Sequence, residues 1–180
     1  IKTHVSYMSD VITAVKGQAV TFSEDTASTF TVEELVKQVN ILMRHELKNA
    51  LIELNLILEV NPKTELRGNI NSLVQVINNM ISNAIQAYNG KPNETIDFII
   101  EENTVNNQII ISICDKGCGL PEQVKEKLFK EMVTTKGKNG TGLGLFMSYS
   151  NIRAHFNGTI TFESEQGKGT NFHIILPLIK

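Results

Sequence analysis

The stretch from Asn71 to Tyr88 carries apolar residues at the spacing of one broad helix face, and two isoleucine-rich runs follow it closely. Those runs, TIDFIIEE and QIIISIC, have the composition of β-strands, and the turn around Thr104 to Asn107 suits a hairpin between them. A helix with such a face is stable only when the face is buried against another element. The chain therefore predicts a long helix packed on a sheet that contains a hairpin.

Further helix and strand patterns alternate with these in blocks. A helix is expected from about Thr31, which stands as an N-cap three residues before Glu34 in a capping-box arrangement. A strand is expected at Glu53 to Val60, and the closing segments GTITFES and TNFHIILP predict a hairpin that turns at Gly167 to Gly169. Since the blocks do not repeat as βαβ units, we predict an α+β two-layer sandwich, a mixed β-sheet covered on one face by helices.

With 180 residues, 41% of them hydrophobic, the chain is long enough for one domain with a real core and a helical extension. Apolar residues from Val5 to Val15 recur at helical spacing, and a polar run then interrupts the pattern. We expect residues 1–20 to form the end of the extension, 21–30 a linker and 31–180 the compact domain. The first residue is not a methionine, so we expect the chain to be cut from a longer protein.

Charge and cysteine content exclude several classes of partner and site. The formal net charge of -2 lacks the basic excess that nucleic-acid or membrane surfaces usually need. Cys114 and Cys118 are not accompanied by a second pair of Cys or His residues at the spacing of a metal site. We therefore expect both to be free thiols in a reducing compartment. No apolar run approaches the length that spans a bilayer.

Two amides stand at helical spacing in NNMISNAIQAY. Asn79 and Asn83 are four residues apart, so both side chains project from one face of the helix, and buried amides need hydrogen-bond partners. A pair of this kind is also what an ordinary solvated helix surface presents. The pair alone leaves a binding role and a surface role open.

Two glycine-containing loops follow. DKGCGL, Asp115 to Leu120, comes directly after a strand; its glycines let the backbone approach a ligand, and its carboxylate can accept a hydrogen bond from an exocyclic amine. NGTGLGL, Asn139 to Leu145, leads into a helix whose first N–H groups favour phosphate. Each loop taken alone is also typical of a plain turn.

The order of these motifs is more specific than any one of them. Asn-x-x-x-Asn-Ala on a helix, Asp-x-Gly-x-Gly after a strand, TTK at Thr134 to Lys136 and Gly-x-Gly-x-Gly before a helix together resemble the ATP-binding domain of the histidine kinase, gyrase and heat-shock chaperone superfamily. The resemblance covers about Thr31 to Pro177. It implies the Bergerat-type fold, with ATP lying against the helices under a lid at roughly Pro121 to Thr141.

The resemblance also assigns roles to individual positions. Asp115 would bind the adenine amino group, and Gly117 and Gly119 would give the base room. Asn83 would ligate a magnesium ion that bridges the phosphates, with Asn79 beside it. The expected residues are, for catalysis, Asn79 and Lys136; for the metal, Asn83 and Asn79; and for the nucleotide, Asn79, Asn83, Asp115, Gly117, Gly119, Thr135, Gly140, Thr141, Gly142, Leu143, Gly144 and Thr170.

Asn79 discriminates among branches of the superfamily. In hydrolytic members such as gyrase and the chaperones this position is a glutamate that activates water, and an amide cannot take that proton. Imidazole brings its own lone pair and depends less on a base. The resemblance therefore favours the catalytic domain of a two-component sensor histidine kinase over an ATPase. A serine kinase of the anti-sigma-factor type and a non-catalytic ATP-binding module are the alternatives.

That assignment carries expectations about partners and location. A response regulator receiver domain would take the phosphate onward, residues 1–20 would belong to the dimerisation hairpin, and the full-length protein would be a homodimer. We expect a cytoplasmic domain, attached to a membrane only through upstream segments if at all.

The sequence also departs from the common kinase pattern. Gln86 stands where lysine is frequent, Ala87 where an aromatic residue is frequent, and Tyr88 follows one place on. The segment LFKEMVTTK around Phe129 lacks the usual proline and second phenylalanine. These departures concern phosphate contacts and lid docking. Lys136 in the same region would touch the terminal phosphate or stay solvated.

MRHELKNAL, which contains His45, resembles the phosphoacceptor stretch of sensor histidine kinases. Between His45 and Asn79 there is room only for one strand and the start of the next helix, whereas an acceptor histidine belongs to a hairpin that precedes the whole domain. We therefore predict that His45 lies in the first helix of the ATP-binding domain and is not the acceptor. His4 would fall on the second helix of the hairpin, so the acceptor is expected upstream of Ile1.

Overall fold

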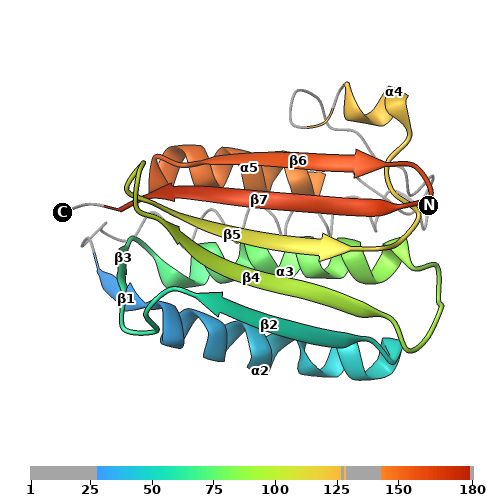
Figure 1. Ribbon diagram of the computed structural model, residues 1–180, viewed down its shortest axis with the longest axis horizontal. Helices are drawn as coiled ribbons and strands as arrows, with labels where there is room; N and C mark the ends of the chain where they lie inside the picture. The colour runs from blue at the N-terminus through green and yellow to red at the C-terminus, as the bar shows by residue number, and fades with distance from the viewer. Residues whose placement is uncertain (1–27, 127, 129–142, 179–180) are drawn as a thin grey trace, which may run out of the picture.

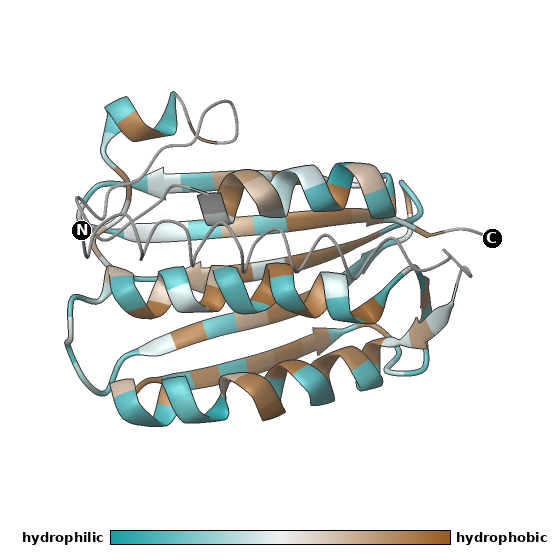
Figure 2. Ribbon diagram, turned by 180° about the vertical axis from the view of Figure 1, so that it is seen from behind, coloured by the Kyte–Doolittle hydropathy of each residue, from teal (hydrophilic) through white to brown (hydrophobic). Residues whose placement is uncertain are grey.

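The computed structural model describes residues 28–126, 128 and 143–178, which form two layers. The helices are α2 (Val32–Ala50), α3 (Ile70–Ala87), α4 (Glu122–Lys125) and α5 (Leu143–Phe156). The strands are β1 (Thr29–Thr31), β2 (Glu53–Glu59), β3 (Glu65–Arg67), β4 (Thr95–Asn103), β5 (Gln108–Asp115), β6 (Thr159–Glu165) and β7 (Gly169–Pro177). Helices α2, α3 and α5 cover one face of the main sheet (Figure 1), as the view from the helix side also shows (Figure 2).

The main sheet has the strand order β2-β4-β5-β7-β6. Strand β2 runs parallel to β4, and the other neighbours are antiparallel. Pairs β4–β5 and β6–β7 are the two hairpins that the sequence predicts, and the second turns at Gly167, whose φ is +85°. The α+β two-layer prediction, with a mixed sheet covered on one face, is confirmed.

The core lies between α3 and the middle of the sheet. Alternate residues of β4 and β5 face the helices, as the two-residue period of a strand requires. The buried residues of α3 are Ser72, Leu73, Val74, Val76, Ile77, Met80, Ile81 and Ala84, and those opposite them include Ile96, Phe98, Ile100, Ile109, Ile111 and Ile113. This burial fixes the rotation of α3 about its axis, so the direction of its polar side chains is fixed as well.

Helix α2 begins as its sequence predicts. The Thr31 hydroxyl accepts the Glu34 N–H at 3.2 Å, and the Glu34 carboxylate accepts the Thr31 N–H at 2.7 Å. The helix leads directly into β2, and His45 lies on its exposed side with Nε2 3.0 Å from Asn49 Nδ2. His45 therefore lies on the first helix that the structure describes, and this helix leads directly into the main sheet.

A small second sheet was not predicted. Strands β1 and β3 pair antiparallel, with Thr29 opposite Arg67 and Thr31 opposite Glu65. Each has three residues, too few to show a two-residue period in the sequence. The pair places the start of α2 beside the start of α3.

Several predictions concern segments that the structure describes only in part. Helix α4 ends at Lys125, and Phe129 lies outside the described residues. The predicted extension at residues 1–20 also lies outside them, so the domain boundaries stay predictions. Within the described ranges, no helix has both the length and the apolar character needed to cross a bilayer.

Asn69 caps α3, because its Oδ1 accepts the N–H groups of Asn71 and Ser72 at 2.9 and 3.2 Å. Asn69→Ala removes this acceptor and is expected to lower the free energy of unfolding by about 1 kcal/mol. Urea denaturation measures the loss. Asn71→Ala, in the first turn of the same helix, is the matched control, and an equal loss in both variants would contradict the capping role.

Candidate nucleotide site

Asp115 is the last residue of β5, and its side chain is only 6% exposed. Its carboxylate accepts the Gly117 N–H at 2.8 Å, and the Thr170 N–H of β7 also stabilises the ionised form. Burial raises the pKa of Asp115 above its ordinary value, and these two N–H groups act in the opposite direction. A carboxylate has about four acceptor positions, so capacity is left for another donor.

The loop that follows β5 is held against the end of α3. The Cys118 N–H donates to the Ala87 carbonyl at 2.9 Å. A Cβ on Gly117 would lie 2.6 Å from both the Cβ and the carbonyl oxygen of Ala87. Gly119 has a φ of +65°, and a Cβ there would lie 2.1 Å from the Glu165 carbonyl oxygen. Only glycine at these two positions lets the loop pass between α3 and the β6–β7 hairpin.

Thr170 lies opposite Asp115 in the β5–β7 pairing and is buried. Its Oγ1 is 2.9 Å from Ser164 Oγ on β6. Ser164 also accepts the Leu120 N–H at 2.8 Å and donates to the Gly169 carbonyl at 3.0 Å. Ser164 could not be identified from the sequence, since its partner Leu120 is 44 residues away in the chain.

Asn79 projects from α3 toward the beginning of α5. Its Nδ2 donates to Ser148 Oγ at 3.1 Å, and a Cβ on Gly144 would lie 2.7 Å from its Oδ1. Asn83 lies half-buried one turn further along α3. The structure thus brings the amide of Asn79 next to Gly144 of the segment NGTGLGL. Ser148 was missed, although its place four residues after Gly144 put it on the same face of α5.

The two amides lie along α3, at different distances from the loop that follows the Asp115 carboxylate. Asn83 and Asn79 precede Ala87 by four and eight residues, which at 1.5 Å per residue is about 6 and 12 Å. Ala87 contacts the loop that begins at Asp115. The carboxylate and the amides therefore stand apart by a distance that the base, sugar and phosphates of a mononucleotide can span.

Part of the predicted set is not covered. Thr135, Lys136, Gly140, Thr141 and Gly142 lie outside the described residues. The backbone of Leu143 begins α5. The described residues therefore include the Asp115 end of the expected site and the two amides of α3.

The two cysteines are free thiols. Cys118 is exposed, and burial raises the pKa of the half-buried Cys114 to about 11. Among the described residues, no group of three His, Cys, Asp or Glu side chains is arranged to hold a metal ion.

Comparison with known proteins identifies the family of the chain. A family model described as "Histidine kinase-, DNA gyrase B-, and HSP90-like ATPase" matches residues 68–180. Sporulation kinase C of Bacillus subtilis is 34% identical over 175 residues, which cover 95% of this chain and 37% of that protein. The chain thus spans well under half the length of that relative.

Solved structures share the fold. The catalytic domain of the histidine kinase ThkA, in a nucleotide-free form, superposes with a TM-score of 0.71 at 27% identity, covering 84% of this chain and 95% of that one. ThkA in complex with the response regulator protein TrrA gives a TM-score of 0.73 at 24% identity, covering 97% of this chain and 49% of that one. The predicted resemblance is confirmed.

The raised pKa of Asp115 predicts a pH dependence of stability. Because the folded state favours the protonated carboxyl, the stability that Asp115 contributes is present below its unfolded pKa and is lost as the pH rises through its folded pKa. Asp115→Asn is therefore expected to gain stability relative to the wild type as the pH rises above about 4, the ordinary pKa of an aspartate. Urea denaturation across this range measures the difference.

Ile113→Val, a buried change in the same strand, is the control, since it removes no ionisable group. Its effect on the free energy of unfolding should not vary with pH. A difference between Asp115→Asn and the wild type that is constant with pH, or that shrinks as the pH rises, would contradict the buried-carboxylate account.

Proposed function

Because the chain belongs to the family of histidine kinase-, DNA gyrase B- and HSP90-like ATPases, we propose that it is the ATP-binding catalytic domain of a sensor histidine kinase. Its reaction is transfer of the γ-phosphoryl group of ATP to a histidine outside this domain. The observation that carries the proposal is the buried carboxylate of Asp115, placed at one end of α3 with the amides of Asn79 and Asn83 further along it.

The base end favours adenine. When it is ionised, the Asp115 carboxylate can only accept hydrogen bonds, so it suits the exocyclic amine of adenine. Guanine presents a carbonyl oxygen at the corresponding ring position, which would face the carboxylate with two acceptors opposed. A buried acceptor left without a donor is costly, so this position discriminates between the two bases.

The phosphate end suits Mg²⁺. Magnesium prefers oxygen ligands, keeps several waters and is held in many sites mainly by the phosphates of its nucleotide. The amide oxygens of Asn79 and Asn83 fit that partial role, and the described residues offer no dense carboxylate cage. The ion would neutralise the charge of the phosphates. The protein's own part is to position the nucleotide so that the reacting groups lie in line.

Asn79 supports a kinase that acts on histidine. Its Nδ2 is engaged by Ser148, and its amide has no basic site to take a proton from water or from a serine hydroxyl. Imidazole attacks with its own lone pair, so it needs less help at this position. This observation favours histidine over the serine kinase alternative, and phosphotransfer separates both from a non-catalytic nucleotide-binding module.

The position of His45 supports an acceptor elsewhere. Helix α2 is part of the helical layer that covers the sheet, and β2, which follows it, pairs with β4. His45 is therefore a surface residue of the domain that binds nucleotide. We further propose that the acceptor histidine lies in a hairpin preceding this domain, that the full-length protein is a homodimer, and that it works in the cytoplasm.

A response regulator receiver domain is the proposed onward partner. The structure of ThkA with TrrA shows such a pairing for a protein of the same fold. Transfer of the phosphoryl group from the histidine to the receiver domain would complete the relay.

Nucleotide binding is the first test. Isothermal titration calorimetry with Mg·ADP should show binding by the wild type, and Asp115→Asn should bind about ten- to a hundredfold more weakly, because a charge-assisted hydrogen bond is lost. Asn83→Ala should weaken binding only when Mg²⁺ is present. GDP should bind the wild type poorly.

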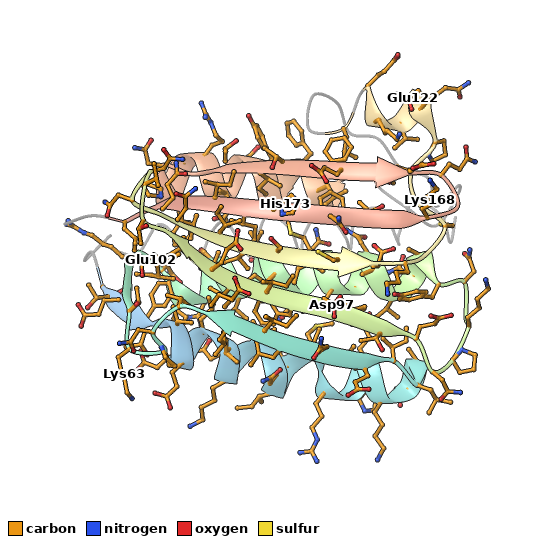
Figure 3. All side chains as sticks on the ribbon, in the orientation of Figure 1. Lys63, Asp97, Glu102, Glu122, Lys168 and His173 are labelled. Carbon is orange, nitrogen blue, oxygen red and sulfur yellow. The ribbon has the colours of Figure 1, made fainter. Side chains whose placement is uncertain are left out.

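Asp97→Asn is the matched control. Asp97 is also an aspartate of the main sheet, but its side chain lies on the face opposite the helices (Figure 3). There its carboxylate accepts a hydrogen bond from Asn55 Nδ2 at 2.8 Å. Its variant should bind Mg·ADP like the wild type. Equal affinity of Asp115→Asn and Asp97→Asn would remove the basis of the assignment.

Phosphotransfer is the second test, made on the full-length protein. With radiolabelled ATP it should form an acid-labile, base-stable phosphoryl group, as expected for phosphohistidine, and His45→Ala should retain it. Acid-stable phosphoserine would favour the alternative kinase. Loss of labelling in His45→Ala, with Mg·ADP binding intact, would show that the acceptor prediction is wrong.

A further inference from the structure

Tyr88 joins three segments at the base end of the site. It is the residue that ends α3, and its side chain is only 2% exposed. Its hydroxyl donates to the Thr95 carbonyl at the start of β4, at 2.6 Å, and accepts the Lys116 N–H at 3.0 Å. One hydroxyl thus links the end of a helix, the beginning of one strand and the loop that follows another.

The Lys116 N–H belongs to the peptide bond that directly follows Asp115. Beyond it, the Gly117 N–H returns to the Asp115 carboxylate, and the Cys118 N–H is held by the Ala87 carbonyl. Ala87 and Tyr88 therefore hold the loop at two points, on either side of the N–H that orients the carboxylate. A shift of the Lys116 peptide would move the hydrogen bond that sets the direction of the Asp115 side chain.

We propose that the Tyr88 hydroxyl is a positioning residue for base recognition, which holds the Asp115 carboxylate in the direction that accepts the adenine amine. The inference rests on the proposed function for the identity of the ligand. Tyr88 does not itself touch the base; it acts through the Lys116 peptide.

Burial keeps this hydroxyl in the form that the contacts need. The pKa of Tyr88 is raised above its ordinary value, mainly by burial, so the hydroxyl stays protonated and donates and accepts at once. Tyr88→Phe keeps the ring and its packing. The substitution removes the hydrogen-bond partner of the Thr95 carbonyl and of the Lys116 N–H in a place with little access to water. Because the Lys116 peptide is no longer held, the loop is freer to move.

A purely structural role for Tyr88 predicts a different result. If the side chain only fills the core, Tyr88→Phe lowers stability but leaves the affinity of the folded molecules unchanged. If it positions the loop, the folded molecules themselves bind adenine nucleotide more weakly. Affinity measured on folded protein and local amide exchange therefore separate the two.

The experiment compares wild type, Tyr88→Phe and Ser112→Ala. Ser112 is a buried hydroxyl of β5 whose Oγ lies 2.7 Å from His173 Nδ1, away from the loop (Figure 3 shows His173). It controls for the loss of one buried hydrogen bond. Without nucleotide, exchange of the Lys116 amide should be about tenfold faster in Tyr88→Phe and unchanged in Ser112→Ala.

With nucleotide, Mg·ADP should bind Tyr88→Phe about tenfold more weakly and Ser112→Ala like the wild type. In the full-length kinase, Tyr88→Phe should raise the KM for ATP with little change in kcat, because the phosphate end keeps its contacts. Unchanged Lys116 exchange in Tyr88→Phe overturns the positioning role, whatever the ligand is. A wild type that does not bind Mg·ADP overturns the proposed function, and with it this inference.

Discussion

The burial of α3 against the sheet is the constraint on which both the fold and the site depend. Its apolar face, centred on Ile77, Met80 and Ile81, is removed from water by the isoleucines of β4 and β5. Once that face is fixed, the side chains of Asn79 and Asn83 have only one direction in which to project. The same packing brings the end of the helix against the loop after β5, so a single helix places both ends of the site.

The base end illustrates how function opposes stability. Removing the Asp115 carboxylate from water is unfavourable, and two backbone N–H groups offset only part of that cost. A ligand that supplies a further hydrogen-bond donor offsets some of the remaining desolvation cost. The unfavourable free energy of the buried carboxylate in the unliganded protein therefore favours ligand binding. Buried carboxylates without a full set of donors are therefore typical of binding sites, and less so of structural cores.

How much the sequence reveals depends on whether the signal is local. The capping box of α2 and the period of β4 and β5 lie within a few residues, so these elements could be predicted. Strands β1 and β3 are too short to show a period. Ser164 and Tyr88 could not be assigned roles, because Leu120 is 44 residues from the first and Lys116 28 residues from the second. Motif order made Asp115, Asn79 and Asn83 candidate site residues, but the contacts that orient them are tertiary.

In the proposed function, adenine nucleotide binds between the Asp115 loop and the amide edge of α3. A titration of the ¹⁵N-labelled protein with Mg·ADP, followed by NMR, would locate the bound nucleotide. We expect the amide signals of Gly117 and Thr170, whose N–H groups share the Asp115 carboxylate, to shift most, together with the side-chain amides of Asn79 and Asn83. Shifts confined to Ser112 and His173 on the opposite face of the sheet, or no shifts from the folded protein, would contradict it.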